Sequence, residues 1–250
     1  MILCLSILSL ILGRSTLDLP KYPTISKAGK TIEAFIPNGW KILDSAFGDL
    51  NRDGRSDAAI VIQSLDSTLD TTFHCDTTIN AGKQTISCDR FLNPRRILIV
   101  LIKSRDGSYE CALQDNDAIL PPNADDEISI GDPYGDWMDA DGGALSIRRG
   151  VLTLHMGQRV GNFNWDRTYR FRYQNGDWYL IGARIDDFQM GSDGHWQYDF
   201  NLLTGQTTEN TQEDFDKTKR ISHFNLGKKP LRKLRDFRPF AWEIVKGATI

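Results

Sequence analysis

The sequence predicts an all-β protein built from antiparallel sheets and meanders. Short runs rich in β-branched and aromatic residues recur along the chain, separated by the Gly, Asn and Asp residues that favour turns. The periodicity of about 3.6 residues that marks an amphipathic helix is nearly absent. Most runs have the usual length of a strand, roughly four to eight residues. The clearest expected strands are residues 58–63, 96–103, 109–114, 145–147, 151–156, 169–173, 178–185 and 196–202.

Two pairs of these strands are joined by short turns. Asp106 and Gly107 separate the second and third strands of the series, and Asn175 and Gly176 separate the sixth and seventh. Asp-Gly and Asn-Gly supply the positive φ angles that tight hairpin turns require. We therefore expect a β-hairpin at each place.

Composition narrows the class of protein. The 250 residues are 40% apolar and 25% charged, which is ordinary for a globular chain with room for one large domain or two small ones. The net charge is -3, with both signs scattered along the chain. This pattern argues against nucleic acid or an anionic membrane surface as a partner.

An apolar run, MILCLSILSLIL, occupies the first twelve residues. It is too short to cross a membrane as a helix but fits the apolar part of a secretory signal. We expect a signal-like segment at residues 1–15, a secreted or periplasmic location, and no stable membrane span after its removal. The alternatives are a buried N-terminal strand or helix, and a longer signal that begins upstream. A lipid anchor on Cys4 would require the longer signal.

An acidic stretch containing Pro121 and Pro122 divides the remaining chain near residue 125. The expected units are an N-terminal β unit at residues 16–125 and an aromatic-rich antiparallel β unit at residues 126–250. In the second unit, the polar segment 207–219 is expected to be a connector that leads to a docked terminal segment.

Three cysteines lie beyond Cys4, so they cannot all pair within one chain. The preferred disulfide joins Cys75 to Cys88, and would contribute about 3 kcal/mol in the chain-entropy model. Zinc binding by His74, Cys75 and Cys88 is the alternative. It is disfavoured because no close Cys or His pair completes a set of four ligands.

The clearest chemical motif is the acidic loop, which we define as residues 49–57. Oxygen-bearing side chains alternate along it, and Gly54 permits a sharp turn. Three carboxylates this close would repel one another unless a cation neutralised them. Calcium suits such a flexible set of oxygens better than magnesium, and a solvated acidic turn is the alternative. The expected ligands are the side chains of Asp49, Asn51, Asp53 and Asp57 and the backbone carbonyl of Arg55.

This loop is not an EF-hand, because Ile60 stands where that motif has a bidentate Glu and an apolar strand follows in place of a helix. The segment FGDLNRDGRSDAAIVI, followed by RILIVLI and DGSY, resembles one FG-GAP or VCBS-type repeat. In that family the loop binds calcium within one blade of a β-propeller. The resemblance covers residues 45–118, and it implies the same five ligands and a propeller-blade-like N-terminal unit.

A full propeller is not expected, because it needs at least about four blades and the sequence contains no second complete loop. Further segments are similar to exported bacterial proteins with a single such repeat, a group that offers no established activity to carry over. These segments are residues 93–95, 114–118, 131–134, 171–173 and 201–205.

Catalytic signatures such as G-x-S-x-G, H-E-x-x-H and the P-loop are absent from the sequence. We therefore assign no catalytic residue and expect a non-catalytic binding or interaction module, with a cell-envelope glycan or protein as its partner. One alternative is a hydrolase of envelope polysaccharide or peptide, and another is a purely structural domain. The hydrolase would use carboxylates of residues 132–141. Its candidate residues are Asp132, Asp136, Asp139, Asp141 and His155.

Aromatic residues concentrate in the C-terminal half, where they form either a stacking platform for sugar or peptide, or part of the core. Trp178 and Tyr179 point to opposite faces of their strand, so at most one of them belongs to the core unless the sheet is covered on both sides. The platform candidates are Trp137, Trp165, Trp178, Trp196 and Tyr198.

Overall fold

The computed structural model describes residues 22–66, 71–80, 83–121, 133–134, 144–160, 162–191, 194–212 and 219–250. Of residues 71–80 and 83–92 it describes the backbone and one side chain, that of Ile86, and of residues 159–160 the backbone alone. Strands make up 57% of the structure and helices 4%, and the antiparallel sheets are open. The predicted all-β class is confirmed, and the architecture is sandwich-like without a closed propeller.

A five-stranded antiparallel sheet forms the N-terminal half, with the strand order β1-β7-β6-β3-β2. Its central strands are apolar at nearly every position because both faces are buried. Val61 on β3 faces the second sheet, whereas Ile60 packs with Phe35 beneath the N-terminal segment. The elements are β1 (Ala28–Gly29), the 3-10 helix η1 (Ile32–Phe35), β2 (Trp40–Gly48), β3 (Asp57–Ser64), β6 (Arg96–Lys103) and β7 (Tyr109–Asp115).

The C-terminal half forms a seven-stranded antiparallel meander, in which each strand pairs with its neighbours in sequence. Asn175 and Gly176 have φ angles of 52° and 80°, so the expected tight hairpin between β10 and β11 is confirmed. The strands are β8 (Leu145–Arg148), β9 (Val151–Val160), β10 (Phe163–Gln174), β11 (Asp177–Gln189), β12 (His195–Asn201), β13 (Gln206–Gln212) and β14 (Arg220–Asn225).

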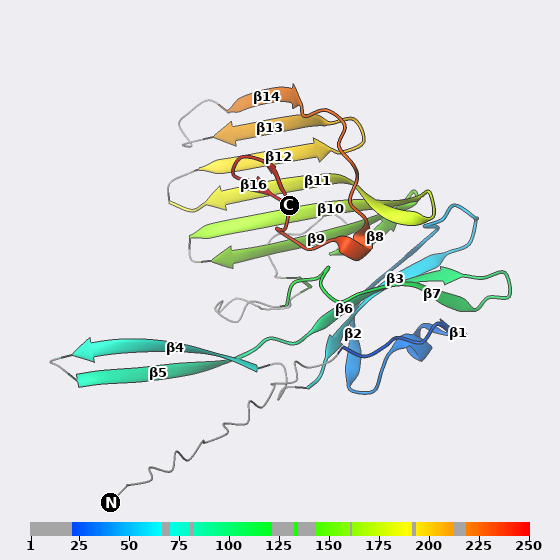
Figure 1. Ribbon diagram of the computed structural model, residues 1–250, viewed down its shortest axis with the longest axis horizontal. Coiled ribbons are helices and arrows are strands. Elements are labelled where there is room, and N and C mark those ends of the chain that lie inside the picture. Colours follow the sequence, from blue (N-terminus) through cyan, green and yellow to red (C-terminus); the bar gives the residue numbers. More distant parts are fainter. Residues whose placement is uncertain are drawn as a thin grey trace, which may run out of the picture.

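The two sheets pack on one another and share one hydrophobic core (Figure 1). Val61 and Val100 enter this core from the first sheet, and Phe171 enters it from the second. Gly48 at the end of β2 allows the closest approach, because a Cβ there would lie 2.6 Å from Cγ2 of Ile147 on β8. A larger residue at position 48 would therefore push the two sheets apart.

The segment after β14 returns across the core and holds both sheets. The ring of Phe237 lies 4.7 Å from that of Tyr169 and 5.1 Å from that of Phe171, measured between centroids. The next residue, Arg238, forms an ion pair of 3.5 Å with Asp115 of the first sheet. The expected docking of the terminal segment is confirmed. It contains η2 (Leu234–Asp236), β15 (Glu243–Val245) and β16 (Ala248–Thr249).

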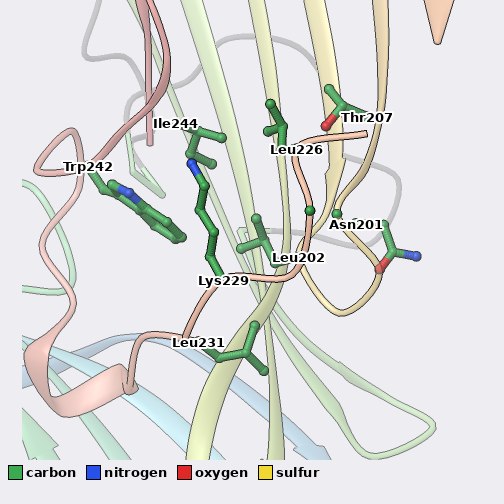
Figure 2. Close-up of a pocket in the computed structure, with 10 residues that line it drawn as sticks. Asn201, Leu202, Thr207, Leu226, Lys229, Leu231, Trp242 and Ile244 are labelled. Atoms are coloured by element: carbon green, nitrogen blue, oxygen red, sulfur yellow. The ribbon is translucent and has the colours of Figure 1, made fainter. Parts of the chain in front are cut away.

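A small crevice remains between this segment and the turn after β12 (Figure 2). Leu202, Leu226, Trp242 and Ile244 supply most of its apolar wall. Its volume is about 10 Å³, which is room for one water molecule. The crevice is therefore a packing seam that admits no organic ligand.

Strands β4 (Thr71–Asn80) and β5 (Lys83–Leu92) form a two-stranded arm that projects from the body (Figure 1). Its register places Cys75 directly opposite Cys88. The Cα atoms of directly opposite residues in an antiparallel pair are about 4.5 to 5.5 Å apart, which is within reach of a disulfide.

The sulfur positions of Cys75 and Cys88 lie outside the described side chains, so their disulfide stays a prediction. Peptide mapping without reductant would test it. Cys111 on β7 is a free, half-buried thiol, and burial raises its pKa. Cys111 would be the cysteine left over if Cys75 and Cys88 form the predicted disulfide.

Several strands were not expected from the sequence. None of the strands expected from the sequence covers residues 71–80 or 83–92, which form the β4–β5 arm, and much of the expected connector at residues 207–219 is β13. Thr207 and Asn210 on β13 are buried although both are polar, so this strand lacks the apolar pattern that reveals its neighbours. The strands of the β4–β5 arm also lack an apolar pattern that would predict them, because their sequence is rich in Thr, Asn and Asp.

No helix in the part of the chain that the structure describes is long and apolar enough to cross a membrane. The signal-like segment expected at residues 1–15 and the domain boundary expected near residue 125 fall outside the described residues.

Candidate calcium loop

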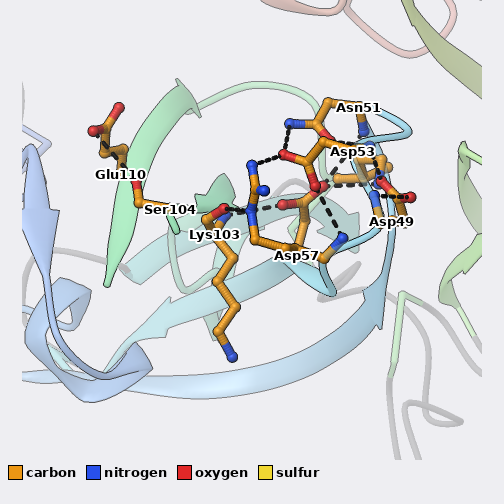
Figure 3. A network of polar contacts seen from close by, with 10 residues as sticks. Asp49, Asn51, Asp53, Asp57, Lys103, Ser104 and Glu110 are labelled. Carbon is orange, nitrogen blue, oxygen red and sulfur yellow. Dashed lines mark hydrogen bonds and ion pairs between the residues drawn. The ribbon is translucent and has the colours of Figure 1, made fainter. Parts of the chain in front are cut away.

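The acidic loop (residues 49–57) joins β2 to β3 where the two sheets meet. Arg52 and Gly54 both adopt left-handed backbone conformations, with φ angles of 64° and 84°. Such angles bend the chain sharply, and at Gly54 the missing Cβ removes their usual cost. The bend gathers Asp49, Asn51 and Asp53 into one polar network (Figure 3).

Backbone N–H groups of the loop hold these three side chains. The Asp49 carboxylate accepts hydrogen bonds from the N–H groups of Asp53 (3.0 Å) and Gly54 (2.8 Å). Oδ1 of Asn51 accepts from Asp53 N–H at 3.1 Å, and Oδ1 of Asp53 accepts from Arg55 N–H at 2.9 Å. These local bonds order the loop, and the carboxylate oxygens retain lone pairs for another partner.

Asp57 fastens the loop to the sheet. It is fully buried, and its carboxylate accepts backbone hydrogen bonds from Leu50 (2.8 Å), Asn51 (3.4 Å) and Lys103 at the end of β6 (2.9 Å). Burial raises the pKa of Asp57 against the lowering effect of these hydrogen bonds, and the nearby charge of Asp53 raises it further. Of the predicted ligands, Asp57 therefore has the clearest structural role.

The side chain of Arg55 lies against the loop's own carboxylates. Its Nη2 pairs with Oδ2 of Asp53, and its Nε donates to the carbonyl oxygen of Lys103 at 2.9 Å. The same Oδ2 of Asp53 accepts from Nδ2 of Asn51 at 2.9 Å. Desolvation acts to raise the pKa of Asp53, but hydrogen bonds from Asn51 and Arg55 and the charge of Arg55 lower it overall.

The loop is packed against both sheets. Leu50 is 1% exposed and belongs to the core between them. Arg52 reaches the turn between β8 and β9, where a Cβ on Gly150 would lie 3.0 Å from its Nε. The shape of the loop is therefore coupled to the packing of the two halves.

The donor set fits a hard cation, because the four predicted side chains all supply oxygen and all belong to one ordered loop. In the present conformation their carboxylates face backbone N–H groups and Arg55. Within the described residues, no group of three His, Cys, Asp or Glu side chains converges closely enough to hold a metal. Ligation would require rotation of the Asn51 and Asp53 side chains.

Comparison with protein-family models, curated proteins and solved structures found no match for this chain. The resemblance to an FG-GAP or VCBS-type repeat stays a prediction. The case for an ion therefore depends on the donor atoms of the loop and their surroundings.

A second acidic site, not anticipated from the sequence, lies on the seven-stranded sheet. Nε2 of His155 on β9 contacts Oδ2 of Asp166 on β10. Asp186 on β11 stands directly opposite Asp166 and accepts hydrogen bonds from His195 (2.5 Å) and Gln197 (2.6 Å) on β12. Sequence spacing could not reveal these pairs, because they depend on strand register. We call His155, Asp166, Asp186 and His195 the His–Asp cluster.

Two hollows in the described part of the chain, an open groove and the C-terminal crevice, bear on the hydrolase alternative. The groove, of about 460 Å³, lies over β13 and β14, beside a hydrogen bond of 3.1 Å between Thr208 and His223. Neither this groove nor the C-terminal crevice has a carboxylate in its wall, so neither holds the pair of carboxylates that glycoside hydrolysis uses. The candidates outside the described residues are Asp132, Asp136, Asp139 and Asp141.

The aromatic candidates divide between core and surface. Trp178 is buried in the core while Tyr179 points to the other face, so the expected alternation is confirmed. The ring of Tyr198 stacks on that of Phe200, with 5.7 Å between centroids, so it is not free to stack on a ligand from that side. Trp137 lies outside the described residues.

Trp165 and Trp196 remain as platform candidates. They are half-buried and stand on either side of Asp187, on one face of three neighbouring strands, and Trp165 also packs against the core. One side of Trp165 already contacts the edge of the Phe240 ring, with 4.9 Å between centroids.

Proposed function

We propose that this chain is an exported, calcium-stabilised β protein that acts as a non-catalytic binding or interaction module of the cell envelope or exterior. The observation that supports this proposal best is the acidic loop. It presents four oxygen side chains on an ordered backbone, at the junction of two sheets. A cation held there would stabilise the junction as well as the loop.

In this proposal the ion is held by the side chains of Asp49, Asn51, Asp53 and Asp57 and by the carbonyl of Arg55. When bound, calcium supplies the positive charge that neutralises neighbouring carboxylates. Asp57 ties the start of the loop to β3 and β6, so loss of the loop's shape would also release Leu50 from the core. Because the unfolded chain has no such arrangement, binding would add to folding stability.

Export and partner choice have separate support. The apolar run at residues 1–12 fits a secretory signal. Extracellular calcium modules bind with dissociation constants of roughly 0.1 to 1 mM, which suits a location outside the cytosol. Trp165 and Trp196, which flank Asp187, form the surface where a cell-envelope glycan or protein would be sought first.

Thermal unfolding of the full chain in excess EDTA and in about 10 mM calcium tests the ion. For a dissociation constant of roughly 0.1 to 1 mM, mass action gives about 1.4 to 2.7 kcal/mol of added stability. The midpoint should rise by about 3 to 10 °C. Asp53→Ala should lose this rise, whereas Asp199→Ala, which removes an exposed carboxylate on β12, should keep it.

Equal midpoints in EDTA and calcium would sink the calcium proposal. If Asp53→Ala folds too poorly to measure, Asp53→Asn keeps the shape of the side chain and removes its charge. A full calcium response in Asp53→Asn and in a folded Asp53→Ala would exclude this residue as a ligand.

The partner is tested by screening the calcium-loaded chain against glycan arrays and cell-envelope fractions. We expect saturable binding that weakens in Trp196→Ala and persists in Tyr179→Ala, which changes an aromatic on the opposite face. Failure to bind any glycan or envelope fraction would argue against a binding module and favour a purely structural domain.

A further inference from the structure

Arg55 plays two separable parts in the acidic loop. Its backbone carbonyl is one of the expected calcium ligands. Its side chain instead supplies a positive charge to the same loop, because Nη2 pairs with Oδ2 of Asp53. One residue thus contributes both a donor for a bound ion and a charge that repels it.

The contacts of Asp53 show why these two parts conflict. Oδ1 accepts from the Arg55 N–H at 2.9 Å, and Oδ2 is shared between Nδ2 of Asn51 and the Arg55 guanidinium. Oδ1 keeps a free lone pair, but both lone pairs of Oδ2 are taken, so a cation that uses both oxygens must displace Asn51 or the guanidinium. Of these two donors, the guanidinium is the one whose positive charge repels the ion.

The position of the Arg55 side chain allows it to leave. It is 33% exposed and the Asp53 side chain is 23% exposed, so solvent can take over the guanidinium. Among the described residues, its other hydrogen bond, of 2.9 Å, goes to the carbonyl of Lys103. Arg105 also acts on Asp53 through its charge, but Arg55 is the cation in direct contact.

We propose that the Arg55 guanidinium is an internal counter-cation, which competes with calcium for the Asp53 carboxylate and thereby sets the calcium affinity of the loop. This inference rests on the calcium proposal above. In the absence of calcium the guanidinium neutralises Asp53 and preserves the loop. With calcium bound, it moves into solvent while the Arg55 carbonyl joins the ligands.

Calorimetric titration of the full chain with calcium chloride, in chelator-treated buffer, tests this competition. Arg55→Gln removes the charge and keeps the backbone carbonyl, so calcium should bind about fivefold more tightly than to the parent. Arg52→Gln is the matched control, because it removes an equal charge from the same loop. In the described part of the chain the Arg52 side chain lies against Gly150 and forms no ion pair with the loop carboxylates, so its substitution should change the affinity by less than about twofold.

Thermal unfolding provides a second measurement, which a purely structural role for Arg55 would not satisfy. In EDTA, Arg55→Gln should unfold at a lower temperature than the parent, because Asp53 has lost its counter-charge. In about 10 mM calcium the two midpoints should converge, since the guanidinium then lies in solvent in the parent as well. A side chain that served only to support the loop would lower the midpoint under both conditions.

The outcomes separate this inference from the proposal on which it rests. If neither the parent nor Arg55→Gln binds calcium up to about 10 mM, at least ten times the expected dissociation constant, both ideas fail together. If the parent binds and Arg55→Gln binds equally or more weakly, only the competition is overturned. Equal tightening in Arg52→Gln and Arg55→Gln would also overturn it, because loop charge alone would then explain the effect.

Discussion

The acidic loop and the His–Asp cluster both hold carboxylates close together, but they compensate the charge differently. In the loop, Asp49 and Asp57 are met by neutral backbone N–H groups, and the Arg55 guanidinium contacts Asp53. In the cluster, side chains on neighbouring strands meet Asp166 and Asp186. The loop therefore retains negative charge for a cation, whereas the cluster is complete without one.

The pKa shifts of Asp57 in the loop and Asp186 in the cluster have opposite directions. Burial raises the pKa of Asp57 despite its three backbone hydrogen bonds. At Asp186 burial also acts to raise the pKa, but hydrogen bonds from Gln197, His195 and Arg184 outweigh it, so the pKa is lowered. Backbone donors order Asp57 without lowering its pKa, whereas the side-chain donors around Asp186 do both.

Removal of Asp57 should have the largest effect. Asp57→Ala leaves the N–H groups of Leu50 and Lys103 without an acceptor inside the protein, at a cost of about 3 kcal/mol in the free energy of unfolding. Urea denaturation in EDTA measures this loss. Asp57→Asn keeps one acceptor oxygen and should lose less, and a loss below about 1 kcal/mol in Asp57→Ala would show that the loop does not depend on this clamp.

The second-largest effect is expected in the pH dependence of stability, which should have opposite signs for Asp57 and Asp186. A raised pKa at Asp57 gives stability that is present below about pH 4 and lost as pH rises through the raised value. A lowered pKa at Asp186 gives stability that is present above about pH 4 and lost as pH falls. Each change amounts to about 1.4 kcal/mol per unit of pKa shift.

Urea denaturation between about pH 3 and 7 checks these signs. In EDTA, Asp57→Asn should remove a decline in stability above about pH 4, and calcium should reduce that decline in the parent. Asp186→Asn should reduce the loss of unfolding free energy below about pH 4, equally with and without calcium. If calcium changed the effect of Asp186→Asn on stability at low pH, the two regions would not differ in the way described.

Loss of one histidine should have a smaller effect that calcium does not change. His195→Ala removes a donor to Asp186 and leaves that carboxylate facing Asp166, so we expect a loss of about 1 kcal/mol. His195→Gln can still donate a hydrogen bond and should recover most of the loss. Denaturation with and without calcium measures both variants, and a loss that calcium reverses would place an ion in the cluster.

The smallest effect is expected for Asp166→Asn. This change weakens the contact with His155 but also removes the repulsion between Asp166 and Asp186, so the two terms should cancel to within about 0.5 kcal/mol. Chemical denaturation near pH 7 measures it. A loss as large as that of His195→Ala would mean that His155 is the main support of the cluster.

The strands that the sequence revealed are those with a distinctive apolar pattern. Residues 58–63 and 96–103 form continuous apolar runs because their sheet is covered on both faces, and they were placed correctly. Strand β13 could not be found, since Thr207 and Asn210 occupy buried positions with polar side chains. A strand cannot be predicted from its apolar pattern where its buried positions carry polar side chains.

The candidate sites follow the same division. The acidic loop is contiguous, so its spacing could be read directly, and the structure brings its side chains together in one network. The contact of Arg55 with Asp53 could not be predicted. The loop pattern predicts a backbone carbonyl ligand at residue 55, but it does not predict the direction of the long Arg55 side chain. The His–Asp cluster depends on the register of four strands, which no local motif encodes.

Amide chemical shifts during a calcium titration test the central claim most directly, because the N–H groups of Gly54 and Arg55 donate to the carboxylates that would bind the ion. We predict saturable shifts at Gly54 and Arg55 with a midpoint of roughly 0.1 to 1 mM, and none at His195 in the His–Asp cluster. Unchanged loop resonances up to about 10 mM calcium would contradict the account.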